Sequence, residues 1–363
     1  MADRFGLIYL HTHLAFAVGA DVDVEPDVAF FASHFARGPV GDEPPTATVA
    51  VHRTAPRPAP DDAEPVLIRR SRTEFFTVRA RQVGGPERPG LVCDASGTWL
   101  AFTPGRHHVR LDVPGHRPGR ELIELVRNTV LGNEENHGVV IVHAAVVDLG
   151  GRAVVIVGPK GAGKTSTALE MILHHGGRML SGDKALLLPA GPGTGAGGDA
   201  VRVAGWPDWP HVGLGTVSRF PQLVDGFDLG PQVGEARAGG DLWSMRHKVP
   251  LDPAGYAEVV DFCPPGTILP VAAVVYPCLG PGTPEGLTPC RNEPDRLAPH
   301  VETSFGSGTA GWNPLVAPSP RLAAFRDDAV RRLAACPAFE LSGSGALHPT
   351  DLAHLGDPAR QRR

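Results

Sequence analysis

The sequence has few cysteines, no long apolar run and no excess of positive charge. Its five cysteines include no C-x-x-C pair, which favours free thiols in a reducing cytoplasm over a disulfide framework or a zinc site. It contains no apolar run of about 18 residues, the length a membrane-spanning helix needs. A net charge of −5 argues against the basic stripe of a nucleic-acid-binding surface. We therefore expect a cytoplasmic protein with no nucleic-acid or membrane partner.

Short alternating segments dominate the first third of the chain. Apolar and polar residues alternate between Pro, Gly and Asp clusters, as in β-strands, in the runs 46–53, 65–71, 74–83 and 98–104. The N-terminal apolar run is broken by His11 and His13, and it predicts one or two buried strands rather than a signal peptide. These patterns predict a β-rich N-terminal lobe over residues 1–118.

A second domain is predicted over residues 119–345, followed by a poorly ordered tail over 346–363. Its elements are expected to be a helix over 119–131, strands over 139–149 and 153–158, a helix over 164–177, strands over 178–188 and 271–277, and a helix over 320–336. Strand, helix and strand at this spacing form a βαβ unit, so the fold class is α/β. On the first helix, Glu121 and Glu124 are expected to face solvent.

Residues 158–165, "GPKGAGKT", match the phosphate-loop (P-loop) pattern G-x-x-x-x-G-K-[ST] in full. The motif lies between a predicted strand and a predicted helix, where glycines let backbone N–H groups turn toward phosphate oxygens. Lys164 is expected to reach the β- and γ-phosphates, and the Thr165 hydroxyl to ligate Mg²⁺. The nucleotide-binding residues are expected to be Gly158, Pro159, Lys160, Gly161, Ala162, Gly163, Lys164, Thr165 and Ser166.

Two further residues near this motif are candidates for the site. A metal-bound nucleotide needs a carboxylate at the end of a neighbouring strand, and Asp183 is the candidate ligand, although "SGDK" also reads as a turn. His143 lies one hairpin before Gly158. An imidazole can accept a proton at neutral pH, so His143 is a candidate base; the alternative is a core histidine bonded to backbone.

Together these motifs resemble the catalytic domain of the HPr kinase/phosphorylase family, especially its stand-alone relatives from biosynthetic gene clusters. The resemblance covers residues 119–188 and implies a P-loop kinase fold related to the core of phosphoenolpyruvate carboxykinase. It implies that His143 lies near the γ-phosphate and that "GGRMLSGD" (176–183) matches the family's RG-x-R-L-x-x-D-D. There the first aspartate is the general base and the second binds the metal. Family members form oligomers, so a homo-oligomer is also implied.

Gly182 stands where the resemblance places the first aspartate, which disfavours a phosphorylase activity and leaves the base open. Phosphoryl transfer has a loose transition state, so positioning and charge neutralisation matter more than proton removal. His143 could supply the base, or Asp208 or His211 could, both in the Trp-rich segment 204–216. That segment reads equally well as a structural loop anchored by its tryptophans.

Arg246 and Lys248 are expected on one face of a strand, at i and i+2. That placement suits a triphosphate or a charged substrate, and the alternative is an exposed edge strand whose charges face water.

The sequence as a whole predicts an ATP- and Mg²⁺-dependent kinase in a biosynthetic pathway. It would transfer the γ-phosphate to a hydroxyl acceptor, either a peptide or protein serine or a small metabolite. The alternative is a nucleotide-gated binding module or weak NTPase, in which Gly182 marks lost transfer chemistry. A decarboxylating carboxykinase would need a dense set of metal ligands, which the sequence does not supply.

Overall fold

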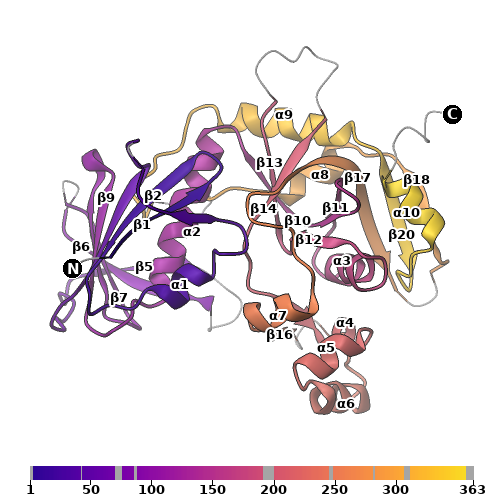
Figure 1. Ribbon diagram of the computed structural model, residues 1–363, viewed down its shortest axis with the longest axis horizontal. Coiled ribbons are helices and arrows are strands. Elements are labelled where there is room, and N and C mark those ends of the chain that lie inside the picture. The colour runs from indigo at the N-terminus through magenta and orange to yellow at the C-terminus, as the bar shows by residue number, and fades with distance from the viewer. Residues whose placement is uncertain are drawn as a thin grey trace. The chain divides into compact units, whose positions relative to one another are not determined.

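The computed structural model divides the chain into two compact units, which are described separately (Figure 1). Unit 1 comprises residues 1–139 and 303–323, and unit 2 comprises residues 140–302 and 324–363. The structure describes residues 3–41, 43–69, 76–85, 88–190, 200–244, 248–280, 283–305 and 311–356. The division differs from the predicted boundary before residue 119, because the helix that begins there packs within unit 1.

Unit 1 is built on one large sheet. Its strands are β1 (Asp3–Tyr9), β2 (Thr12–Val18), β3 (Ala36–Gly38), β4 (Ala47–Arg53), β5 (Glu64–Arg69), β6 (Val78–Val83), β7 (Gly90–Cys93), β8 (Trp99–Thr103) and β9 (His108–Val113). Within the part of the chain described, they follow the order β3-β1-β2-β4-β9-β8-β7-β6-β5, and only β2–β4 and β4–β9 pair in parallel. The predicted β-rich character of this lobe is confirmed.

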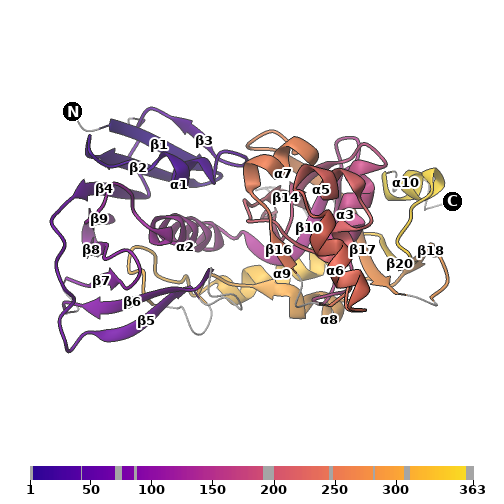
Figure 2. The same cartoon turned by 90° about the horizontal axis from the view of Figure 1, so that it is seen from below.

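The helices of unit 1 are α1 (Glu25–Ala29), the short 3₁₀ turn η2 (Pro104–Arg106) and α2 (Arg120–Asn136). The sheet curls around α2, which contacts both β2 and the distant edge strand β5 (Figure 2). The apolar stripe of α2 faces this concave surface, so Leu125 and Val130 are fully buried.

The expectation that Glu121 and Glu124 face solvent is wrong, because the curled sheet covers more of α2 than one apolar stripe. Glu121 is buried and accepts hydrogen bonds from the Ser96 hydroxyl and the Gly119 N–H. Glu124 is buried and forms an ion pair with Arg69. Buried carboxylates of this kind are retained when partners compensate the cost of removing them from water.

Unit 2 contains the predicted βαβ elements. Its strands are β10 (Val140–Asp148), β11 (Ala153–Val157), β12 (Arg178–Ser181), β13 (Lys184–Leu187), β14 (Arg202–Gly205), β15 (His211–Gly213), β16 (Lys248–Pro250), β17 (Ile268–Leu279), β18 (Gly286–Cys290), β19 (Val301–Glu302) and β20 (Ala338–Gly343). Its helices are α3 (Lys164–Leu173), α4 (Leu214–Val217), α5 (Pro221–Gly226), α6 (Gly230–Ala238), α7 (Pro253–Val259), α8 (Pro294–Leu297), η3 (Ala298–His300), α9 (Leu322–Ala334) and α10 (Pro349–Gly356).

Two long strands organise unit 2, since each pairs with different neighbours along its length. The first half of β10 pairs with β13 and β19, and its second half pairs with β11 and β12. Likewise, β17 pairs with β14 near its start, then with β11, and finally with β20. The strands β11, β17 and β20 are parallel, so their carboxyl ends lie at one edge of the sheet.

Two apolar clusters fill unit 2. One lies on one face of the sheet, where strand residues such as Val142 and Val155 share a cluster with Val330 of α9. The other covers the opposite face, where β-branched residues of the strands meet α3 and the small group of helices α4 to α7 (Figure 1). The strands have continuous apolar sequences because both of their faces are covered.

The prediction of a poorly ordered tail is wrong for residues 346–356. They contain α10, and Leu347 and Leu355 belong to the buried cluster that also holds α3. Residues 357–363 lie outside the described part of the chain. The short amphipathic pattern around two leucines is too brief to stand out in the sequence, although it suffices to attach the helix to an existing core.

The predicted strand over 178–188 is divided into β12 and β13 by a break at Gly182 and Asp183. The other predicted strands and helices of unit 2 are confirmed within a few residues. Helices α4 to α7 were not predicted, because their segments are short and begin at, or directly after, glycine or proline. In the described residues, no helix is long and apolar enough to cross a membrane.

Candidate active site

The segment 158–165 connects β11 to α3, as the motif predicts. Gly161 and Gly163 have φ values of +90° and +108°, a region that side-chain-bearing residues rarely adopt. Gly163 caps the N-terminus of α3, and a Cβ atom built there would lie 2.6 Å from Leu279 Cδ1. The sequence therefore needs glycine at 163 for both its backbone angle and the close approach of β17.

The exposure of this segment changes along its length. Pro159, Lys160 and Gly161 are exposed, whereas Ala162 through Thr165 are half-buried. Ser166 is buried, and its hydroxyl lies 2.8 Å from the hydroxyl of Thr216 on α4. Helix α4 is thereby fixed beside the first turn of α3.

The Lys164 ammonium folds back over the loop. It donates a hydrogen bond to the Gly158 carbonyl at 2.8 Å and lies 3.4 Å from the Pro159 carbonyl. Burial lowers the pKa of Lys164, the Asp183 carboxylate opposes this shift, and the charge of Lys248 adds to it. Asp183 and Lys248 therefore each lie within electrostatic range of Lys164.

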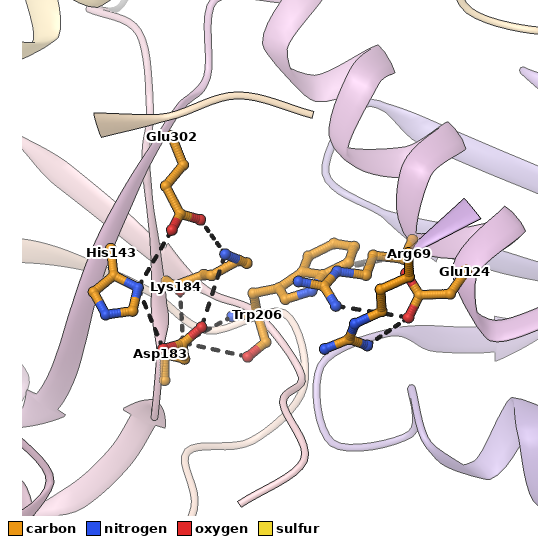
Figure 3. Close-up of polar contacts among 9 residues, drawn as sticks. Arg69, Glu124, His143, Asp183, Lys184, Trp206 and Glu302 are labelled. Carbon is orange, nitrogen blue, oxygen red and sulfur yellow. Dashed lines mark hydrogen bonds and ion pairs between the residues drawn. The ribbon is translucent and has the colours of Figure 1, made fainter. Parts of the chain in front are cut away.

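His143 lies on β10, opposite Lys184 in the register with β13. Its Nδ1 atom is 3.4 Å from Asp183 Oδ1 and 3.4 Å from Glu302 Oε1 (Figure 3). The other residues of β10 are buried, whereas the His143 side chain is 32% exposed. His143 is therefore not a core histidine bonded to backbone, because its ring bridges two carboxylates at a surface of unit 2.

Asp183 lies in the break between β12 and β13. It is therefore a turn residue, and its side chain is still a candidate metal ligand. Its carbonyl accepts a hydrogen bond from the Ala144 N–H, which fixes the break against β10. Its carboxylate lies 3.8 Å from Lys184 Nζ and faces His143 (Figure 3). The backbone role therefore leaves the side chain available for the site.

Glu302 and Lys184 belong to this cluster and were missed by sequence reasoning. Glu302 lies on β19, which pairs with β10, and its carboxylate forms an ion pair with the buried Lys184 ammonium (Figure 3). Burial alone would raise the pKa of Glu302, but the hydrogen bond from His143 and the charge of Lys184 lower this pKa to about 2. Glu302 is therefore an anion at neutral pH.

His300 is a further residue that the sequence did not indicate. It ends η3, two residues before Glu302. Burial lowers the pKa of His300, and the charges of Lys164 and His143 lower it further. The pattern H-V-E was a weak signal, since residues at i and i+2 of an extended segment share one face.

The Trp-rich segment is partly structural. Trp206 is 1% exposed, and its backbone N–H donates to the Ser181 hydroxyl at 3.3 Å. Asp208 lies near Tyr256 of α7, whose pKa is raised by burial and by the Asp208 charge. His211 begins β15 and pairs with Pro250 of β16. The structural interpretation holds for Trp206, and the roles of Asp208 and His211 stay predictions.

Arg246 and Lys248, the two predicted cations near the phosphate site, differ in what the structure describes. Lys248 begins β16 and lies close enough to Lys164 to lower its pKa. Arg246 lies outside the described residues. Of these two residues, only Lys248 can be related to Lys164 in the described part of the chain.

A magnesium ion would have to be held largely by its nucleotide. Among the described residues, no group of three or more His, Cys, Asp or Glu side chains is arranged so that it could hold a metal ion by itself. Mg²⁺ in phosphoryl-transfer enzymes is typically bound by one or two carboxylates together with substrate phosphates and water. Asp183, whose side chain is 35% exposed and whose charge raises the pKa of Lys164, fits this limited role. Thr165 would provide the hydroxyl ligand.

No protein-family model and no curated protein matches this chain. The resemblance to HPr kinases thus depends on the motifs themselves. What the structure adds is the arrangement of Lys164, His143, Asp183 and Glu302 within one unit.

Proposed function

We propose that unit 2 is an ATP- and Mg²⁺-dependent phosphotransferase that acts on a hydroxyl acceptor, either a peptide or protein serine or a small metabolite. One observation carries this proposal. The imidazole of His143 contacts Asp183, whose carboxylate is within electrostatic range of the P-loop lysine Lys164. A candidate phosphate-binding cation, a candidate metal ligand and a candidate base thus belong to the same group of interacting charges, which supports the proposal.

The proposed division of roles follows from charge. Lys164 and Lys248 would neutralise the phosphate oxygens, on which negative charge develops in the transition state. A bound Mg²⁺ would supply additional charge neutralisation, with Asp183 and Thr165 as its protein ligands. Because Lys164 now bonds to the carbonyls of its own loop, nucleotide binding would require it to exchange these bonds for phosphate oxygens.

The proposed transfer step uses His143 as proton acceptor. The acceptor oxygen forms a bond to the γ-phosphorus while the bond from that phosphorus to the β,γ-bridging oxygen breaks, which releases ADP. The acceptor's hydroxyl proton moves to Nε2 of His143. Nδ1 faces the two carboxylates, so the proposal assigns the proton to Nε2, on the other side of the ring.

The experiment that tests the proposal has two stages. Thermal-shift measurements with ATP, GTP and ADP, with and without Mg²⁺, should show stabilisation by a nucleotide. Product mass spectrometry on candidate acceptors should then show the addition of one phosphoryl group. Lys164→Ala is the matched control and should lose both effects. Stabilisation without any transfer would favour the alternative, a nucleotide-gated binding module, for which the missing acid at Gly182 is the motivating observation.

A further inference from the structure

Position 182 offers space for a side chain that it does not contain. A Cβ atom built on Gly182 would meet no other atom within 4 Å. The φ angle of Gly182 is not positive, so the backbone would accept a residue with a side chain. Glycine at this position is therefore not required by packing or by backbone geometry.

A second carboxylate nevertheless reaches the same imidazole from another part of the chain. Glu302 Oε1 lies as close to His143 Nδ1 as Asp183 Oδ1 does, at 3.4 Å (Figure 3). The strand pairing of β19 with β10 fixes the backbone of Glu302, and the ion pair with Lys184 fixes its side chain. Both contacts hold the carboxylate in place without using the oxygen atom that faces His143.

A carboxylate held this way can orient a histidine but is itself a poor proton acceptor. Its negative charge is already compensated by the buried Lys184 ammonium. In catalytic Ser-His-Asp triads, a buried carboxylate hydrogen-bonded to Nδ1 selects the tautomer and the orientation in which Nε2 accepts a proton. The contact between Glu302 and Nδ1 has the same relation to the ring.

We propose that Glu302 is a positioning residue that orients the His143 imidazole and thereby compensates for the carboxylate missing at Gly182. The inference rests on the proposed phosphotransferase function. It assigns separate tasks to the two carboxylates. Asp183 is left for the metal, and Glu302 holds the ring.

Steady-state kinetics of Glu302→Gln test this assignment. The substitution preserves size and removes the charge, so kcat should fall about 10-fold to 100-fold, part of the about 10²–10⁴-fold that a general base contributes. KM for the nucleotide should change little. Glu340→Gln is the matched control, since Glu340, on β20, forms an ion pair with Arg296 of α8 and has a similarly exposed side chain. The kcat of this variant should be that of the wild type.

Two double variants separate positioning from a merely structural role. If Glu302 acts through His143, Glu302→Gln should have no further effect on kcat in a His143→Ala background, because the effects of two residues in direct contact are not additive. Gly182→Asp should restore kcat of Glu302→Gln to within about 5-fold of the wild type, since it introduces a carboxylate directly before Asp183, whose side chain contacts the ring. If Glu302→Gln fails to fold, Glu302→Asp takes its place in the assay. This variant keeps the charge on a side chain shorter by one methylene, and it should also lower kcat.

The outcomes distinguish the two proposals. A wild-type chain that binds nucleotide and transfers no phosphoryl group overturns both. An active wild type with an equally active Glu302→Gln variant overturns only the role of Glu302. Multiplicative loss in the double variant with His143→Ala would likewise show that Glu302 acts independently of His143.

Discussion

Replacing Gly163 by alanine should destabilise unit 2 for two reasons that can be measured separately. At φ +108°, a side-chain-bearing residue is strained, which costs about 1–2 kcal/mol. The added methyl group would also lie 2.6 Å from Leu279 Cδ1 and 2.7 Å from its Cγ, so Leu279 must move. Overpacking of this kind costs about 1–3 kcal/mol. We expect a total loss of about 2–5 kcal/mol in the free energy of unfolding.

Two other glycines of unit 2 provide matched controls. Gly150 has φ +65° with no atom near a built Cβ, so Gly150→Ala should cost only the strain of about 1–2 kcal/mol. Gly182 has neither a positive φ nor a close neighbour, so Gly182→Ala should leave stability unchanged or raise it by up to about 1 kcal/mol. The three variants thus isolate the strain and the steric clash.

Urea unfolding followed by circular dichroism gives the three free energies. Leu279→Ala in the Gly163→Ala background should recover the part of the loss that comes from the clash, relative to Leu279→Ala alone. If Gly163→Ala is no less stable than Gly150→Ala, the close approach of β17 to the loop is not as the structure has it.

Three further predictions concern the charged residues of the candidate site. Lys164→Ala should lower kcat by at least about 10²-fold in a phosphate-transfer assay, because one preorganised charge contributes that much, and a wild-type rate would refute the assignment of the loop. Asp183→Asn should raise the Mg²⁺ concentration needed for half-maximal rate, and an unaltered metal titration would reduce Asp183 to a turn residue. Since folding lowers the Glu302 pKa from 4.5 to about 2, its carboxylate contributes stability above pH 4.5 that is lost as pH falls toward 2. Denaturation at about pH 6 and about pH 3 should therefore show Glu302→Gln closer to the wild type at the lower pH, and an equal difference at both would contradict the shift.

Local patterns made much of the fold predictable. Alternating residues identified β4, β5, β6 and β8 of unit 1, and continuous β-branched runs identified β10 and β11. The glycines of the 158–165 motif predicted the turn that joins β11 to α3, because their backbone angles are a local property. The α/β class follows from the order of these elements.

Contacts between distant segments were not predictable in the same way. Glu302 follows β10 by more than a hundred residues, and only the pairing of β19 with β10 brings it to His143. Glu121 and Glu124 were misjudged for a related reason, since the curvature of the unit 1 sheet decides how much of α2 is covered. A single sequence contains no periodic signal for either effect.

The sharing of β10 and β17 between two sets of partners has a consequence for how unit 2 comes apart. Separating β13 and β14 from the unit would strip hydrogen-bond partners from the same two strands that support β11 and β20. Neither group of strands can therefore open locally without weakening the other, and the two apolar clusters should melt as one cooperative foldon. The amides of β10 and β17 would accordingly exchange with solvent only through global unfolding. The catalytic candidate His143, at the residue where β10 changes partners, would then lie on one of the strands of unit 2 that exchange most slowly.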